Sequence, residues 1–536
     1  MRITKVDSSA QTPTVRPRSE PGAVLLIALL LLAFGLGFAA HQGGWYRPLE
    51  TIAVSFARRP ALTAASLLRR SDLPTLTLDV KLARYLELVD RRDQALRTGA
   101  NAVSAQDFVS ATITGPDGPV PIWLRLAAGP ATGLAGARWP LEAVSRQDAT
   151  LFGQRAFTLT PADAGTLSTW GYLETLRRAG LLASPYRLVL LTLNGSSKGL
   201  YAEEAHPSSA WLAAPGRPEV AVVYFDAAAY WEAWAWQTVA PTGDGFPTAR
   251  AAVDCPATEA AASAVCLDAL RALQALQSGT LAPSAVLDVD ETAKFLALTT
   301  LWRGSPELDW RSLYLAYDPT TARLTPIGTG SRPLPAAPLP PSLLDDPQLQ
   351  VAVGRALAQY SSPDYLAQLQ AELGADLETV EWDLWPDLGD VADPWTALEA
   401  HQAAMRRQLA PERTLLASVE TADESALVLR LTNVLPFPVQ VASLEVGEAG
   451  LLPIDPAWVD ESDRALLVDG VEAVVLRAAA APRPVHLRVP LAALPAGYGQ
   501  DGLAADPLRV VTSLYLLAGE QVVVAVQAEA EGGGTP

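Results

Sequence analysis

The spacing of hydrophobic positions predicts a mixture of helices and strands between Asp72 and about residue 410. Apolar residues recur with helical period in several segments, and Gly99 and Gly180 stand where two of these helices would end, since glycine readily adopts the left-handed C-cap conformation. Short runs that alternate apolar and polar residues lie between these segments. The helices are expected over residues 76–99, 166–179, 267–277, 290–302 and much of 347–409.

Three hairpins are expected in the same region, because turn residues separate pairs of alternating runs. Residues 107–114 and 120–126 flank the sequence GPDG, residues 186–193 precede Asn194-Gly195, and a third pair surrounds Asp318-Pro319. Asn-Gly is a strong signal for a two-residue hairpin turn. A turn therefore explains residues 194–196 better than the glycosylation sequon that they also match.

After about residue 415 the pattern changes to short alternating runs separated by turn residues. These runs include ALVLRLTN, VQVASLEV, VHLRVPL and QVVVAVQA. About six or seven short strands of this kind are typical of a β-sandwich. We therefore expect a β-sandwich domain over residues 415–530, preceded by helices and by an extended proline-rich loop at residues 331–342.

One uncharged apolar run, residues 22–40, stands near the N-terminus. About 20 apolar residues in a helix span the hydrocarbon core of a bilayer, and a helix satisfies its own backbone hydrogen bonds there. Basic residues dominate the preceding segment, and such a flank stays in the cytoplasm. The sequence therefore predicts a cytoplasmic tail (1–21), a transmembrane helix (22–40), a juxtamembrane connector (41–71) and an extracytoplasmic bulk at the cell membrane.

A cleaved signal peptide is the alternative interpretation of this run. Gly37 and Ala39 form a small-residue pattern that signal peptidase recognises. The apolar run is longer than the usual signal core of about 7–15 residues, which favours the anchor.

Composition narrows the possible partners. The net charge of −18 disfavours binding to nucleic acid, because an acidic surface repels a phosphate backbone. The two cysteines, Cys255 and Cys266, are close in sequence, and an extracytoplasmic location favours a disulfide between them over two free thiols. Two cysteines and four scattered histidines do not form a recognisable zinc motif, so no metal ligands are predicted.

Three stretches in the middle of the chain resemble, in order and spacing, the CotH family, the spore coat protein H type of protein-kinase-like proteins. LLTLNGSSKGLYAEEAH (190–206) is similar to the family's strand, Asn-Gly turn, Gly-x-Tyr and following Glu. Residues 287–328 resemble its helix, Asp-Trp-x-Asn segment and strand pair, and residues 149–161 its Leu-Phe-Gly stretch. The resemblance implies an α+β fold, with a protein-kinase-like (CotH-type) domain over residues 72–410 between the transmembrane helix and the β-sandwich.

The same resemblance implies roles for three residues. Asp309, in the sequence ELDWRS, matches the family's orienting Asp. Glu204 matches the family's acid partner of the phosphate-binding cation if the alignment is shifted by one residue. Acidic residues also suit a solvated helix start, which is the alternative explanation for Glu204. Arg138, just before Trp139, replaces a lysine that binds the nucleotide phosphates, although a plain surface arginine explains it equally well.

Four departures from the family pattern fall at its polar positions. Ser312 stands where the family has a metal-binding Asn, and Gly330 stands where it has a metal-binding Asp. Glu142 replaces a basic residue, and Ala205 occupies the usual position of the acid partner. Phosphoryl transfer depends on charge neutralisation by Mg²⁺ and cations. The departures therefore imply a scaffold that has lost catalysis and needs no cofactor.

The sequence thus predicts a membrane-anchored, extracytoplasmic pseudokinase that acts as a binding or scaffold module for a protein partner at the cell envelope. One alternative is an active kinase that uses ATP and Mg²⁺ to phosphorylate extracytoplasmic proteins. The other is a carbohydrate-binding surface protein whose stacking faces come from YWEAWAW (230–236). Core packing along a helix explains that aromatic run better.

Overall fold

The computed structural model describes the chain from Asp72 to Gln527 with several gaps. The described residues are 72–146, 149–212, 220–237, 249–255, 261–305, 309–330, 345–422, 424–447, 450–478, 482–495, 508–517 and 519–527. The predicted tail, transmembrane helix and connector (1–71) lie outside these residues, as does the proline-rich segment. Within the described ranges, no helix has both the length and the apolar character needed to cross a bilayer.

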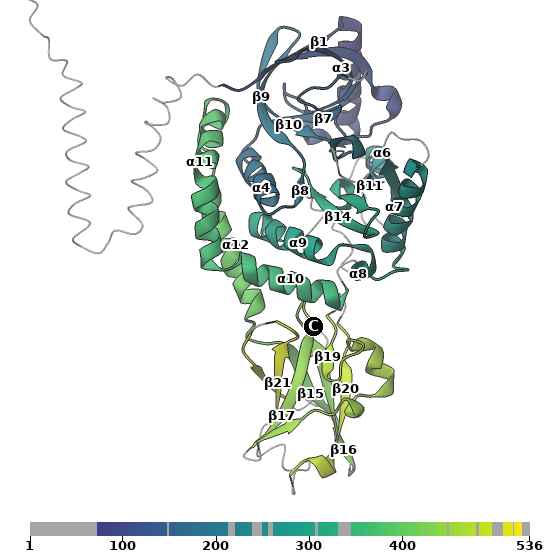
Figure 1. Ribbon diagram of the computed structural model, residues 1–536, viewed down its shortest axis with the longest axis vertical. Helices are drawn as coiled ribbons and strands as arrows, with labels where there is room; N and C mark the ends of the chain where they lie inside the picture. The colour runs from purple at the N-terminus through teal and green to yellow at the C-terminus, as the bar shows by residue number, and fades with distance from the viewer. Residues whose placement is uncertain are drawn as a thin grey trace, which may run out of the picture. The chain divides into compact units, whose positions relative to one another are not determined.

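Seven strands at the start of the described chain close into a β-barrel (Figure 1). Neighbouring strands run antiparallel except β1 and β9, which pair in parallel with Thr75 opposite Leu190. Alternate residues of each strand point inward, and Ile113, Ile122 and Leu124 are fully buried in the barrel core. The strands, in barrel order, are β1 (Thr75–Val80), β3 (Val109–Gly115), β4 (Gly118–Leu126), β6 (Leu141–Ser145), β7 (Ala156–Pro161), β10 (Ser196–Ala205) and β9 (Tyr186–Leu193).

The closed barrel overturns the expected fold class, a protein-kinase-like domain. The difference begins at residues 76–80, which the helical spacing assigned to a helix over 76–99. They form strand β1 instead, and the helix α3 covers only Leu82–Thr98, with Gly99 as its left-handed C-cap. Because β1 pairs with β3 on one side and β9 on the other, it joins the two edges of the sheet and leaves no edge open.

A second, five-stranded sheet is formed by four strands that follow the barrel in the chain and by one short strand that comes before β9. The turn of its β13–β14 hairpin is fixed by Asp318, whose Oδ1 accepts a hydrogen bond of 2.8 Å from the N–H of Thr320. Cys255, directly after β12, forms the predicted disulfide with Cys266 of helix α7 (Ala261–Ser278), so this bond joins the end of the edge strand to a helix packed on the sheet. The strand order is β12 (Arg250–Asp254), β11 (Ala221–Asp226), β13 (Tyr314–Asp318), β14 (Arg323–Gly328) and β8 (Leu182–Ala183).

Helices surround this sheet, and several begin at side chains that cap them. Asp288 accepts a hydrogen bond from the N–H of Glu291 and so starts α9, whose residues are buried on nearly every side. Asp346 caps α10 in the same way. The helices are α4 (Thr166–Arg178), α5 (Ser209–Leu212), α6 (Ala228–Gln237), α7 (Ala261–Ser278), α8 (Pro283–Val286), α9 (Val289–Arg303), α10 (Pro347–Tyr360), α11 (Pro363–Leu388) and α12 (Pro394–Leu409).

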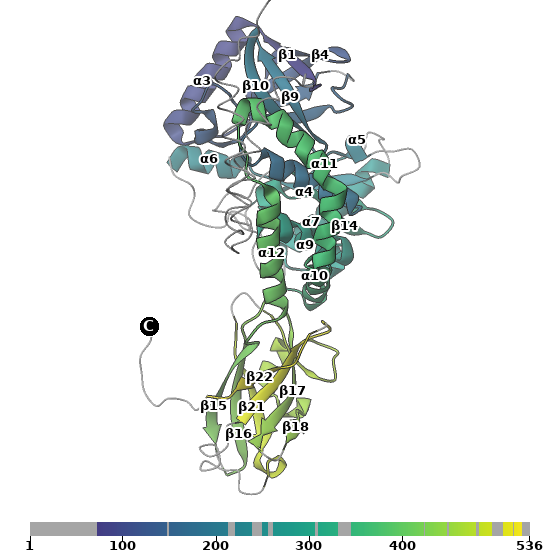
Figure 2. The same cartoon turned by 90° about the vertical axis from the view of Figure 1, so that its left-hand side faces the viewer.

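The strands predicted after residue 415 are present and form two antiparallel sheets (Figure 2). Val485, Leu487 and Val489 alternate with more exposed residues along one strand, as the sequence pattern predicts. One sheet contains β15 (Leu415–Ala422), β16 (Ala426–Asn433) and β20 (Val485–Pro490). The other contains β18 (Leu451–Pro453), β17 (Val439–Val446), β21 (Leu508–Leu514) and β22 (Val522–Ala525), with β19 (Val474–Leu476) paired to β17.

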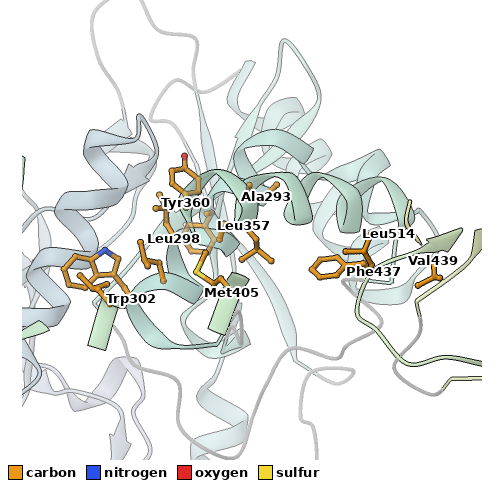
Figure 3. Close-up of a cluster of buried hydrophobic side chains, with 14 of the residues drawn as sticks. Ala293, Leu298, Trp302, Leu357, Tyr360, Met405, Phe437, Val439 and Leu514 are labelled. Carbon is orange, nitrogen blue, oxygen red and sulfur yellow. The ribbon is translucent and has the colours of Figure 1, made fainter. Parts of the chain in front are cut away.

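One cluster of buried side chains includes residues from the helices and from the C-terminal strands. Figure 3 shows Leu357 and Met405, from α10 and α12, in the same cluster as Phe437, Val439 and Leu514. Each of these five side chains is at most 6% exposed. Burial of this apolar area stabilises the helices and the strands jointly.

Candidate functional site

The predicted acid partner and the predicted metal position come together in the structure. Strand β10 carries Glu204, and its Oε1 accepts a hydrogen bond of 2.6 Å from the N–H of Gly330, just after β14. A Cβ atom on Gly330 would lie 2.8 Å from Oε2 of Glu204 and 3.0 Å from Cγ2 of Thr169. A side chain at this position would therefore displace the Glu204 carboxylate, which lies in the space that a metal-binding side chain would enter.

Arg303, at the end of α9, completes this contact. Its Nη2 donates a hydrogen bond of 3.0 Å to the carbonyl oxygen of Thr329, and its guanidinium lies 4.4 Å from the ring centre of Tyr172. Burial raises the pKa of Glu204 to about 7, although the Gly330 hydrogen bond and the charge of Arg303 act in the opposite direction. Glu204 therefore changes its charge near neutral pH, and its described partners are groups of the chain itself.

Glu203 points to the other face of strand β10 and is fully buried. Its Oε2 lies 2.8 Å from Nε of Arg187 on the neighbouring strand β9, and that guanidinium stacks 4.2 Å from the ring centre of Phe152. Burial raises the pKa of Glu203 to about 7, and the positive charge of Arg187 limits the rise. In this pair the carboxylate is buried, whereas the Arg187 side chain is 34% exposed.

Asp309, the predicted orienting residue, is held inside a buried ion pair. Its Oδ1 accepts hydrogen bonds from the backbone N–H and from Nε of Arg311, and its Oδ2 lies 2.6 Å from Nη2 of the same residue. The two side chains are only 5% and 4% exposed. The Arg311 guanidinium also lies 4.5 Å from the ring centre of Tyr230. Ser312, the other predicted metal position, donates its hydroxyl to the carbonyl oxygen of Asp309.

Arg138, the predicted phosphate ligand, pairs with another part of the chain. Its Nη1 lies 2.7 Å from Oδ2 of Asp387 in α11, which also accepts a hydrogen bond from the N–H of Leu200. The positive charge that acts on Glu204 comes from Arg303. The structure therefore unites Glu204 with Gly330 and gives Asp309 and Arg138 separate partners.

A further polar group was missed by reasoning from the sequence. Arg125 on β4 and Glu142 on β6 face each other and form a bidentate ion pair, with N–O distances of 2.8 and 2.9 Å. The charge of Glu142 raises the pKa of Tyr224 and of Tyr314, whose rings stack 5.4 Å apart, although burial is the main cause for both. The alternation along the two strands offered a signal for this pair, because it predicts that Arg125 and Glu142 point to the same face.

His206 belongs to the same polar group. Its Nε2 lies 2.6 Å from Oγ1 of Thr158, and its backbone N–H donates to Ala156. Burial lowers the pKa of His206, and the charge of Glu142 partly offsets this. The imidazole is therefore neutral near pH 7. The single positive charge of Arg125 neutralises the single negative charge of Glu142, and His206 adds no charge to this group.

The aromatic run 230–236 lies on helix α6 and is largely used in packing. Tyr230 and Trp231 are buried, and Tyr230 meets the ring of Trp310 edge-on at 5.9 Å. Trp236 is 81% exposed. Core packing, rather than a set of stacking faces for sugar, accounts for the buried members of this run.

A possible metal-binding group exists elsewhere in the described residues. Asp460, Asp463 and His486, all near strand β20, each offer a ligand atom, and these atoms lie within 4.8 Å of one another. Neither Glu204 nor Asp309 belongs to it. Spacing in the sequence gave no signal for this group, because His486 follows the two aspartates only after a separation of more than 20 residues.

No model of a known protein family matches the chain, and no curated protein sequence is significantly similar to it. The CotH resemblance therefore remains a prediction that rests on the three stretches described above. The fold and the contacts define a protein with a closed barrel, a helix-flanked sheet and two C-terminal sheets, in which each of the predicted catalytic groups contacts a partner within the chain.

Proposed function

We propose that this chain is a membrane-anchored, extracytoplasmic binding or scaffold protein of the cell envelope that does not transfer phosphate. The observation that carries this proposal is the buried ion pair between Asp309 and Arg311. A residue that orients a substrate hydroxyl must offer a carboxylate oxygen to it. Both oxygens of Asp309 already contact the Arg311 guanidinium, and the side chain is 5% exposed.

The other requirements of phosphoryl transfer are also unmet at the predicted positions. Mg²⁺ prefers hard oxygen ligands in near-octahedral geometry. Gly330 has no side chain, and the space beside it is filled by Glu204, which accepts its N–H. Arg138, the predicted cation, is neutralised by Asp387 at 2.7 Å. These contacts support a role in binding over catalysis.

The proposed location rests on the apolar run 22–40 and its basic flank. The disulfide between Cys255 and Cys266 supports it, because such bonds persist mainly in oxidising compartments. The proposed partner is another protein of the envelope, since the net charge of −18 is unfavourable for nucleic acid.

Label transfer from ATP tests the central claim. The purified full-length chain, incubated with Mg²⁺ and γ-labelled ATP in the presence of envelope proteins, is expected to label neither itself nor them. Calorimetric titration with ATP and Mg²⁺ should show no saturable heat. Label transfer that the wild-type chain performs and the Asp309→Asn variant loses would establish the active-kinase alternative instead.

The location has its own test. Protease added to right-side-out vesicles should digest the chain beyond residue 45, and complete protection would refute the predicted topology. A mature N-terminus near Ala40 would convert the predicted anchor into a cleaved signal.

A further inference from the structure

A histidine with carboxylates on both sides lies on the C-terminal sheet that contains β15, β16 and β20. Nδ1 of His486 lies 2.6 Å from Oδ2 of Asp463, and its Nε2 lies 3.1 Å from Oε2 of Glu420. Asp460 is the third acid, and its ligand atom lies within 4.8 Å of those of Asp463 and His486. The four residues come from three separate elements: β15, β20 and the 3-10 helix η8 (Glu461–Leu466) together with its N-cap residue, Asp460.

We propose that Asp460, Asp463 and His486 bind one divalent transition-metal ion of the Zn²⁺ class. Ligand atoms bound to one tetrahedral metal at about 2.0–2.2 Å lie about 3.3–3.6 Å apart, so a group whose atoms lie within 4.8 Å of one another reaches this geometry by side-chain movements of up to about 1.5 Å. Three protein ligands and one water complete a tetrahedral zinc site. The proposed site uses Nδ1 of His486, which lies 2.6 Å from Oδ2 of Asp463.

Backbone contacts hold the ligands in place before any ion binds. The N–H of Asp460 donates to the carbonyl oxygen of His486 at 3.1 Å, and the N–H of His486 donates to Oδ2 of Asp463 at 2.8 Å. His486 and Asp463 are mostly buried, with side chains 25% and 14% exposed. Little side-chain freedom is therefore lost when the ion binds, which favours affinity.

Glu420 occupies the position of a supporting carboxylate. Metal-binding imidazoles usually donate their other ring N–H to a carboxylate, which fixes the ring and increases its basicity. Glu420 lies at a break in the pairing of β15 with β16, between Val419 and Thr421. Such a bulge redirects side chains, and this one brings Glu420 to Nε2 of His486.

The donor set selects the class of ion. One imidazole and two carboxylates suit Zn²⁺ and similar first-row ions, whereas Ca²⁺ requires about 6–8 oxygen ligands. Arg488 lies nearby, with its Nε 3.7 Å from Oδ1 of Asp460, a separation too long for a hydrogen bond. Two aspartates and this arginine leave a net negative charge for the cation.

Zn²⁺ titration of the metal-free, untagged full-length chain tests the proposal. Calorimetry should give one Zn²⁺ per chain with a Kd in the micromolar range or below, and Ca²⁺ should not compete. His486→Gln and Asp463→Asn should each weaken binding at least about 100-fold, whereas Glu420→Gln should weaken it by about 10–100-fold at unchanged stoichiometry. Glu445→Gln is the matched control, because Glu445 is a carboxylate on β17 that pairs only loosely with Arg509, at 3.7 Å.

X-ray absorption of the Zn²⁺-loaded wild-type chain makes the test independent of the folding of any variant. It should show one imidazole nitrogen among oxygen ligands and no sulfur. Absence of saturable Zn²⁺ binding, binding that His486→Gln leaves intact, or a first shell without imidazole would each overturn the proposal.

Discussion

The buried pair of Asp309 and Arg311 gives the sharpest prediction. Asp309→Asn removes one charge and leaves the Arg311 guanidinium buried, with 4% of its side chain exposed. At 2.6 Å and an effective dielectric constant of about 20, the lost Coulomb attraction is about 6 kcal/mol. Desolvation offsets part of this attraction, and the loss of one partner from a buried pair typically costs about 3–5 kcal/mol.

We expect a cost near the lower end of that range. The arginine retains its contacts with the rings of Tyr230 and Trp231, whose centres lie 4.5 and 5.3 Å from its central carbon. A loss of about 3 kcal/mol should lower the apparent Tm by about 3 °C if residues 71–536 unfold as one unit. Differential scanning calorimetry measures this shift, and hydrogen exchange at residues 309–313 should increase with it.

A matched control separates the buried pair from ion pairs in general. Asp268 and Arg271 also lie close in sequence, but their side chains are 54% and 72% exposed. Asp268→Asn should therefore change stability by less than about 1 kcal/mol. In addition, the double variant Asp309→Asn with Arg311→Met should lose less stability than the two single variants combined, because it leaves no unpaired charge.

The result that would refute this reasoning is a specific one. If Asp309→Asn shifts the Tm no more than Asp268→Asn does, the pair does not hold Asp309 in place. The aspartate would then be available to a substrate, and the main support for a non-catalytic protein would be lost.

Three further predictions follow from other contacts. Gly330→Ala should destabilise the chain by about 1–3 kcal/mol, seen as a lower Tm, because its Cβ would crowd Glu204; an unchanged Tm would show that the space is open. Cys255→Ser with Cys266→Ser should lower stability by about 3 kcal/mol, and alkylation of the unreduced wild-type chain should label neither thiol. The pKa of Glu203 is raised from 4.5 to about 7, so its contribution to the free energy of unfolding is full below pH 4.5 and is lost as the pH rises through 7. The loss is on the order of 3 kcal/mol. Glu203→Gln should therefore flatten the decline in Tm between pH 5 and 8, and an identical pH profile would contradict the buried acid.

Local structure was largely predictable from the sequence. The turn at Asn194-Gly195 has positive φ at both residues, 48° and 77°, as a two-residue hairpin turn requires. The hairpins around Gly115–Gly118 and Asp318, the helices α4, α7 and α9 to α12, and the C-terminal strands follow the predicted periods, whereas the short helices α5 and α8 were not predicted. These features depend on residues near one another in the chain, so their patterns are visible in the sequence.

The kinase-like fold was wrong because closure of the barrel depends on distant pairing. Residues 76–80 were assigned to a helix, as part of the helical period over 76–99. Their pairing with β9, more than 100 residues later, decides that they form a strand. Tertiary context overrides local preference for such short segments.

The partners of the candidate site residues were likewise decided by the tertiary structure. Residues 126 positions apart form the contact between Glu204 and Gly330, and 249 positions separate Arg138 from Asp387. The sequence identified which side chains carry charge and which turns they follow. Only the fold determines that Asp309 is buried against Arg311 and that Asp460, Asp463 and His486 converge, because burial and distance arise when remote segments pack together.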